Sequence, residues 1–294
     1  MERIVPHLWF DREAREAAEF YTTLFENSGV TRVETIHDTP SGDAETVAFT
    51  LAGQPFEAIS AGPVFHINPS ISLMAHCDTR EEVDRLWQAL ANGGEVMMPL
   101  DAYPFNAHYG WIQDRYGLSW QLMFSPERGE EPKIVPSMLF SGTVNGKAED
   151  AARYYTEVFP LSSVDLISRY AQGEAQSDLA RVNYVGFHLA GQPFVAMDNG
   201  FDVEYTFTEA FSLIVYCESQ DEIDEYWQKL SHAPEAEACG WVRDRFGVSW
   251  QIIPTAMEKL MNTGDEAANG RVVQAMLGMK KLDIQALQDA YDGR

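Results

Sequence analysis

The sequence has little positive charge. Only 21 of its 294 residues are lysine or arginine, against 45 aspartates and glutamates, and the formal net charge is −24. Nucleic-acid binding needs clusters of basic side chains that pair with phosphates, and no such cluster is present. An anionic membrane surface is disfavoured for the same reason. We therefore expect neither nucleic acid nor a membrane as a partner.

The sequence also lacks long apolar runs. None approaches the roughly 20 residues that a membrane-spanning helix needs. The first residues, "MERIVPHLWFDRE", are charged at once and contain no apolar core typical of a signal peptide. The three cysteines do not make a disulfide framework, and Cys77 and Cys217 each end an apolar run. These absences predict a cytoplasmic protein with reduced, buried thiols.

What the chain does contain is an internal repeat. "GWIQDRYGLSWQL" at 110–122 and "GWVRDRFGVSWQI" at 240–252 share eight of thirteen letters at an offset of 130. "IVPHLWF" (4–10) is similar to "IVPSMLF" (134–140), and "LAGQPF" occurs at both 51–56 and 189–194. Because the matches keep their order, they indicate a duplicated domain. We place the first copy at 1–128, the second at 133–254, and a tail at 255–294.

Each copy alternates between two kinds of periodicity. Apolar residues at helical spacing predict helices at 14–25, 83–90, 148–159 and 223–230. Thr79 with Glu82, and Ser219 with Glu222, have the spacing of capping boxes. Strand-like alternation covers 4–10, 31–37, 45–52, 55–60, 70–77, 109–113 and 119–124, with a weak strand at 95–100. The predicted order is strand, helix and three strands, twice in each copy.

This order, with "WFDREAREAAEFY" and "DRYGLSWQL", resembles the vicinal oxygen chelate (glyoxalase/bleomycin-resistance) superfamily. "GQPF", "CDTREEVDRLW" and "GWVRDRFGVSWQI" are similar to its PhnB-like branch, which is often labelled 3-demethylubiquinone 3-methyltransferase-like. The resemblance implies an α+β protein with two tandem glyoxalase-like domains. In each domain, two βαβββ modules curl mixed sheets around a cavity. Methyltransferase chemistry is not expected, because no glycine-rich loop between a strand and a helix is evident to hold S-adenosylmethionine.

The resemblance also implies where a divalent metal would bind, with one ligand from each of four strands. In the first copy the matching positions hold Val5, Glu57, Ser72 and Gln121, with His7 and His76 one pleat away on the same faces. In the second copy they hold Val135, Val195, Ser212 and Gln251. Valine cannot ligate, and glutamine binds a metal more weakly than glutamate. One metal held by His7, Glu57, His76 and Gln121 is therefore conceivable in the first domain, and none is expected in the second.

Three functions remain open at this point. A metal-assisted enzyme would use that metal to polarise substrate oxygens, with Glu57 as the catalytic base. A metal-free binder would hold a small aromatic or oxygen-rich molecule on aromatic surfaces, for which Trp9, Tyr103, Phe105, His108 and Tyr109 are suited. An interaction protein would have vestigial pockets. Fold alone does not decide between them.

The site has two possible locations. The first domain alone contains Glu57, His7 and His76, which favours a pocket there. If the modules instead exchange across a pseudo-twofold axis, His7 and Glu57 share a cavity with Ser212, Tyr216 and Gln251. Duplication would place a relative's dimer contact within one chain, so we expect a pseudo-dimer that is a monomer or a weak homodimer.

The tail carries two amphipathic stripes. Val272, Val273, Met276, Leu277 and Lys280 fall at helical spacing, and Asp283 is placed to cap a second helix that carries Ile284, Leu287 and Tyr291. Forty residues cannot bury such stripes alone. We predict that the tail packs on the second domain of its own chain, with contact to another subunit as the alternative.

Overall fold

The protein is described by a computed structural model that covers residues 3–39, 42–129, 131–261 and 263–294. The first half of the first repeat contains β1 (Ile4–Phe10), α1 (Ala14–Thr22), β2 (Gly29–Thr39), β3 (Gly42–Leu51) and β4 (Gln54–Ser60). The second half contains β5 (Ile71–Cys77), α2 (Arg80–Ala91), β6 (Glu95–Tyr103), β7 (Asn106–Gln113) and β8 (Ser119–Phe124). Both halves have the predicted βαβββ order.

The second repeat is similar until its end. It begins with β9 (Ile134–Phe140), the short helix η1 (Gly142–Val144), α3 (Ala148–Val158), β10 (Ser163–Arg169), β11 (Val182–Leu189) and β12 (Gln192–Asp198). It continues with β13 (Phe211–Cys217), α4 (Gln220–Leu230), η2 (Pro234–Ala236), β14 (Trp241–Arg243) and β15 (Ser249–Pro254). The predicted order of strand, helix and three strands is therefore incomplete in the last module, which has two strands after its helix. The shorter segment there contains Pro234, which cannot donate to a strand ladder, and it forms η2 where the first repeat has β6.

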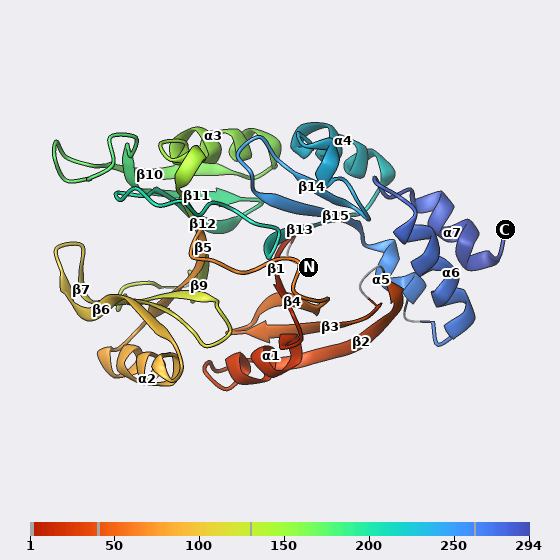
Figure 1. Cartoon of the computed structure of the whole chain (residues 1–294), viewed down its shortest axis with the longest axis horizontal. Coiled ribbons are helices and arrows are strands. Elements are labelled where there is room, and N and C mark those ends of the chain that lie inside the picture. The colour runs from red at the N-terminus through yellow and green to blue at the C-terminus, as the bar shows by residue number, and fades with distance from the viewer. Residues whose placement is uncertain (1–2, 40–41, 130, 262) are drawn as a thin grey trace.

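The strands form two mixed sheets, and each sheet takes one half from each repeat. Sheet A has the order β14-β15-β13-β1-β4-β3-β2, and sheet B has the order β10-β11-β12-β9-β5-β8-β7-β6. The central pairings cross the repeats: β1 runs antiparallel to β13 with His7 opposite Ser212, and β5 runs antiparallel to β9 with Ser72 opposite Ser137. Figure 1 shows sheet B on the left and sheet A on the right, with the first repeat below the second. The halves are thus exchanged between the repeats.

The repeated "GQPF" motif secures this exchange. The side chain of Gln54 donates to the carbonyl oxygen of Ile134 (2.8 Å) and accepts from its amide (3.0 Å). Gln192 makes the equivalent pair of bonds with Ile4, at 2.8 and 2.9 Å. Each glutamine therefore bonds to the first strand of the other repeat, as the duplicated sequence requires.

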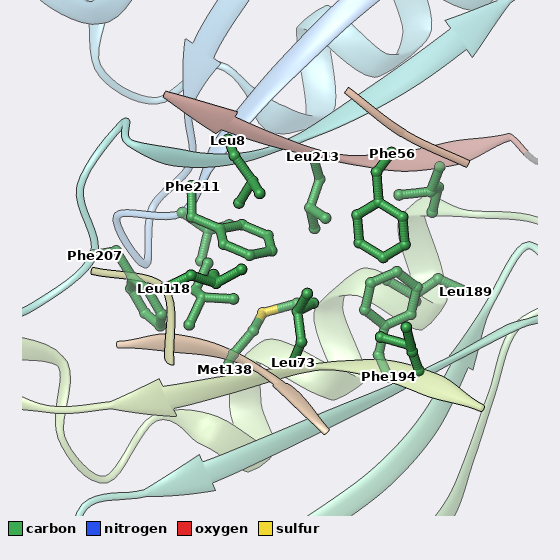
Figure 2. Packing of buried hydrophobic residues seen from close by; sticks show 14 of the residues in the cluster. Leu8, Phe56, Leu73, Leu118, Met138, Leu189, Phe194, Phe207, Phe211 and Leu213 are labelled. Atoms are coloured by element: carbon green, nitrogen blue, oxygen red, sulfur yellow. The ribbon is translucent and has the colours of Figure 1, made fainter. Parts of the chain in front are cut away.

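The main core lies between the two sheets and their helices. Leu8, Phe56 and Leu213 of sheet A point towards Leu73, Met138 and Phe194 of sheet B (Figure 2). Trp120 and Trp250 are fully buried, as predicted. Because side chains alternate along a strand, the neighbouring residues, such as His7 and Glu57, lie on the opposite, concave faces of the curled sheets.

The tail forms three helices: α5 (Ala256–Met261), α6 (Glu266–Leu277) and α7 (Ile284–Asp292). Asp283 caps α7 by accepting from the amide of Ala286 at 2.8 Å, as predicted. The helices pack together around Val272, Leu282 and Leu287, and they contact Ile253 of β15. Figure 1 shows them beyond the outer side of sheet A, away from sheet B. Among the described residues, no helix is long and apolar enough to cross a membrane.

Candidate functional site

The structure divides the predicted site residues between the two sheets. His7, Trp9, Glu57, Ser212, Tyr216 and Gln251 belong to strands of sheet A, and Ser72, His76, Tyr103 and Gln121 belong to strands of sheet B, with Phe105 in the turn between β6 and β7. The expected set of His7, Glu57, His76 and Gln121 is therefore not brought together. The physical reason is the exchange of halves, which pairs β1 with β13 rather than β5. The second arrangement, with His7 and Glu57 beside Ser212, Tyr216 and Gln251, is the one that forms.

The concave face of sheet A does not provide the donor set that a hard divalent ion prefers. At the family's ligand positions it presents Val5, Glu57, Ser212 and Gln251, which include one carboxylate. The amide nitrogen of Gln251 donates to the Ser212 hydroxyl at 2.9 Å, so both side chains already bond to each other. Within the described ranges, no group of three or more His, Cys, Asp and Glu side chains is arranged to share a metal. These residues do not fit the metal that the superfamily implies.

The centre of this face is a buried polar chain. The Ser212 hydroxyl accepts from Gln251 and lies 3.3 Å from Nδ1 of His7, to which it is free to donate. Burial lowers the pKa of His7 to about 3, so its imidazole is neutral near pH 7. The edge of its ring meets Trp241 at 5.6 Å between centroids. His7 is therefore a buried, hydrogen-bonded residue of the sheet.

Glu57 of β4, which lies beside His7, and Tyr216 of β13 are on the same face and line a cleft. The Tyr216 hydroxyl donates to Oε1 of Glu57. Burial raises the pKa of Glu57, an effect that the Tyr216 hydrogen bond and nearby Arg32 partly oppose, and burial beside Glu57 raises the pKa of Tyr216. The cleft has a volume of about 1110 Å³. Two of the predicted site residues thus face open space.

The C-terminal helices form one wall of this cleft. Its apolar lining is Ile36, Ile253, Met257, Met261, Val273 and Met276. Its polar and charged lining includes Arg32, Glu34, Thr46, Glu57, Tyr216, Glu258, Gln274 and Arg271. The backbone of the tail is held to the second repeat, where the amides of Cys239 and Gly240 donate to the carbonyls of Met279 and Lys280 at 2.8 Å. Gln220 also bonds to the backbone of Leu282 and Ile284.

Sequence reasoning missed this wall. The apolar stripe on residues 272–277 was visible, and its packing on the chain itself was predicted. Nothing in the stripe indicates that it lies opposite β2, which contributes Arg32 and Glu34 from more than 200 positions away. The methionines at 257, 261 and 276 were the available hint, because flexible thioether side chains are common at adaptable binding surfaces.

The concave face of sheet B is filled. Met74, Val135 and Val195 form a buried cluster there with Met123, Tyr184 and Met197 packed against it. Val195 takes the place of Glu57 in the second repeat, and its side chain is 2% exposed. Gln121 donates to the hydroxyls of Ser72 (2.6 Å) and Ser137 (3.4 Å) and accepts from that of Tyr109 (2.8 Å). All three hydrogen bonds join Gln121 to residues of the same sheet, so this glutamine connects neighbouring strands.

The other predicted residues of sheet B lie at its margins. Nδ1 of His76 is 3.0 Å from the Ser125 hydroxyl, and burial, with a smaller effect of Arg128, lowers the pKa of His76 to about 4. Tyr103, Phe105 and Tyr109 contact one another at the β6–β7 hairpin, where Phe105 is 62% exposed. Nε2 of His108 lies 2.7 Å from a carboxylate oxygen of Asp84. These residues do not share an enclosed space with Glu57.

The connection between β9 and α3 bears on the expectation that no glycine-rich loop holds S-adenosylmethionine. Residues 141–147, "SGTVNGK", are a glycine-containing loop between a strand and a helix. A Cβ atom at Gly146 would lie 2.4 Å from the carbonyl oxygen of Leu179, and one at Gly142 would lie 3.3 Å from that of Glu204. The first helical amide, of Ala148, donates to the buried carboxylate of Asp198. The glycines therefore allow close packing of the chain on itself, and the helix terminus is occupied by Asp198.

Exchanged βαβββ halves and two outward concave faces define a member of the vicinal oxygen chelate superfamily. The family model described as 3-demethylubiquinone-9 3-methyltransferase matches residues 2–123 and again residues 132–253. The chain belongs to this family, as a tandem duplication.

Several solved structures are similar to the chain. A PhnB protein from Bacillus cereus is 36% identical over 42% of this chain and 100% of its own, with a TM-score of 0.40. A Pseudomonas aeruginosa protein is 26% identical over 42% of this chain and 98% of its own, with a TM-score of 0.38. Glyoxalase I from Zea mays is 10% identical over 89% of this chain and 95% of its own, and its TM-score of 0.57 shows the shared fold. Comparison with curated proteins found no match.

Proposed function

We propose that this protein binds a small molecule in the cleft between the concave face of sheet A and the C-terminal helices, without a metal. The observation that carries the proposal is the contrast between the two faces. Sheet A opens into about 1110 Å³ with Glu57 and Tyr216 on its surface, whereas valines and methionines fill sheet B. A volume of this size accommodates a drug-sized ligand. The proposed site takes residues from both repeats and from the tail, which corresponds to the second of the two locations considered.

Glu57 is the group at which chemistry would begin if the bound molecule is transformed. Its carboxyl group is half-buried, and a raised pKa brings its protonation closer to neutral pH, which suits a general base. The phenol of Tyr216 fixes the carboxylate through the bond to Oε1. These observations support Glu57 as the central polar group of the cleft.

The test fills the cleft without disturbing the fold. Gly270 lies on α6 and lines the cleft, and a Cβ added there meets no atom within 4 Å. A phenylalanine at this position would project into the cleft, while alanine would leave it open. Alanine also removes the helix penalty of glycine, about 1 kcal/mol, and phenylalanine removes part of it, so neither should destabilise α6.

The readout is the fluorescence of the neutral dye N-phenyl-1-naphthylamine. We expect the parent protein and Gly270→Ala to bind the dye similarly, and Gly270→Phe to bind it at least about tenfold more weakly, which corresponds to about 1.4 kcal/mol. Equal binding by both variants, or no dye binding by the parent protein, would contradict the proposal.

A further inference from the structure

We propose that the cleft selects an amphipathic molecule that is uncharged or cationic and that donates a hydrogen bond to Glu57, and that it excludes anionic molecules. This inference rests on the function proposed above and specifies its ligand. Three features of the lining support it: one carboxylate oxygen that is available as an acceptor, cationic side chains that already have protein partners, and an apolar wall.

The available acceptor is the second carboxylate oxygen of Glu57. Oε1 accepts from Tyr216, and the Glu57 side chain has no other hydrogen bond among the described residues. An ionised carboxylate is only an acceptor, so Oε2 can bind a hydroxyl, an amide or an ammonium group of a ligand. A ligand carboxylate, phosphate or sulfonate offers no donor when ionised and would bring a second negative charge beside the first.

The cations that line the cleft are already engaged. Arg32 is close enough to Glu57 to lower the pKa of its carboxyl group. Nε of Arg32 lies 3.4 Å from Oε2 of Glu34, and Nη1 lies 3.7 Å from Oε1 of Glu258. A ligand anion would have to compete with both of these carboxylates for one guanidinium. The like charges of Glu34 and Glu258 also oppose any further negative charge near Glu57.

The two arginines of the tail that line the cleft form hydrogen bonds and ion pairs within the tail. Arg271 donates to the carbonyl oxygens of Ala290 (2.8 Å) and Tyr291 (2.5 Å) at the end of α7. Arg294 pairs with Asp289 at 3.1 Å and with Asp292 at 2.7 Å. The remaining lining histidine, His37, lies 2.9 Å from Asp43. Each of these side chains is therefore already bonded to protein oxygens, Arg271 to carbonyl oxygens and the others to carboxylates.

The apolar wall determines the rest of the molecule. Met257 and Met261 of α5 and Met276 of α6 line the cleft with Ile253 of β15 and Val273. Methionine side chains adapt to different shapes, and they contact alkyl and aromatic surfaces equally well. A ligand with its donor at Glu57 would therefore place an alkyl or aromatic body against the tail.

The experiment compares three ligands of the same length. Octylamine, octan-1-ol and octanoate differ in charge at neutral pH but share one alkyl chain, and each is titrated against bound N-phenyl-1-naphthylamine at 150 mM salt. The parent protein should bind the amine and the alcohol at least tenfold more tightly than octanoate. In Glu57→Gln, the preference for octylamine over octanoate should fall about tenfold.

Glu45→Gln is the matched control, because it removes one carboxylate from β3 at a position that does not line the cleft. It should retain the full preference, which separates a local effect from the general attraction of an acidic protein for cations. Octanoate that binds as tightly as octylamine to the parent protein would overturn the inference, as would an unchanged preference in Glu57→Gln. Dye binding that is insensitive to Gly270→Phe would instead overturn the proposed function, and this inference with it.

Discussion

The concave faces of sheets A and B are built from equivalent strands but have opposite contents. Both have a serine opposite the central strand and a glutamine on the next, in Ser212 with Gln251 and in Ser72 with Gln121. Where sheet A has Glu57, sheet B has Val195 in a cluster with Met74 and Val135. The face of sheet A has a polar group and is bordered by the C-terminal helices, whereas the face of sheet B carries a small apolar core. Apolar side chains packed in such a core stabilise it, because they are removed from water.

The largest effect is expected when the residues that distinguish the two faces, Glu57 and Val195, are replaced by each other's side chain. Val195→Glu would place an unpaired carboxylate in a dry cluster, and it should lower the free energy of unfolding by about 3–5 kcal/mol. Glu57→Val removes a group that already faces a cleft, and it should change stability by about 1 kcal/mol or less. Urea denaturation measures both. Similar losses in the two variants would show that the faces do not differ in the way described.

The second effect is a loss of folding stability at acidic pH that results from the buried histidines. His7 has a pKa of about 3, below its ordinary value of 6.5, so the unfolded chain binds this proton more readily than the folded one. Stability therefore falls as the pH drops below about 6.5, by up to roughly 1.4 kcal/mol for each pH unit. His7→Gln should flatten this fall between pH 6.5 and 4 in denaturation experiments.

His76 of sheet B supplies the comparison. Its pKa of about 4 predicts the same direction of change over a narrower range of pH. A His7→Gln variant whose stability falls as steeply as that of the parent would show that His7 is not held neutral by burial.

The third effect tests whether the tail is a separate unit of stability. Leu287 is fully buried among the C-terminal helices, and Leu287→Ala should destabilise their packing by about 2–4 kcal/mol. Amide hydrogen exchange should then rise in residues 256–292, while the strands of sheet B remain protected. Faster exchange throughout both sheets would mean instead that the tail and the repeats unfold as one unit.

The smallest effect concerns the pH dependence of Glu57. Because its pKa is raised in the folded protein, its contribution to stability is present below its ordinary pKa and is lost as the pH rises through the folded value. Glu57→Gln lacks this loss, so its stability relative to the parent should increase over that range. Thermal melts from pH 4 to 8 provide the measurement, with Glu45→Gln as the control. A relative stability that is constant with pH would contradict the raised pKa.

Much of the fold could be predicted from the sequence, because it is written twice and in local patterns. The strands, the helices and the caps at Thr79 and Asp283 follow from spacing that neighbouring residues determine. The partner of β1 could not be predicted. "SISLMAHC" and the equivalent strand "FSLIVYC" have the same apolar pattern, and both place a serine opposite the central strand. Either could pair with β1, and only the packing of the whole chain selects β13.

The candidate site depends on that selection, and so it was predicted only in part. Glu57 and Tyr216 were named in one of the two arrangements considered, and the structure brings them together. The tail's share in the cleft is a long-range contact between α5–α6 and β2, for which no local pattern exists. The repeated glutamines were both candidate ligand-binding residues, and each bonds to a serine of its own sheet, Gln121 to Ser72 and Gln251 to Ser212.

The exchange of halves also has a consequence for synthesis of the chain. β1 is made before the other described strands, but its neighbour β13 lies about 205 residues further along, at Ser212 opposite His7. Until then, one side of β1 is an unpaired strand edge, which is a template for pairing with other chains. Sheet B meets its central partners earlier, because β5 and β9 are close in sequence. We expect the nascent chain to assemble the centre of sheet B before that of sheet A, because its paired strands are closer in sequence.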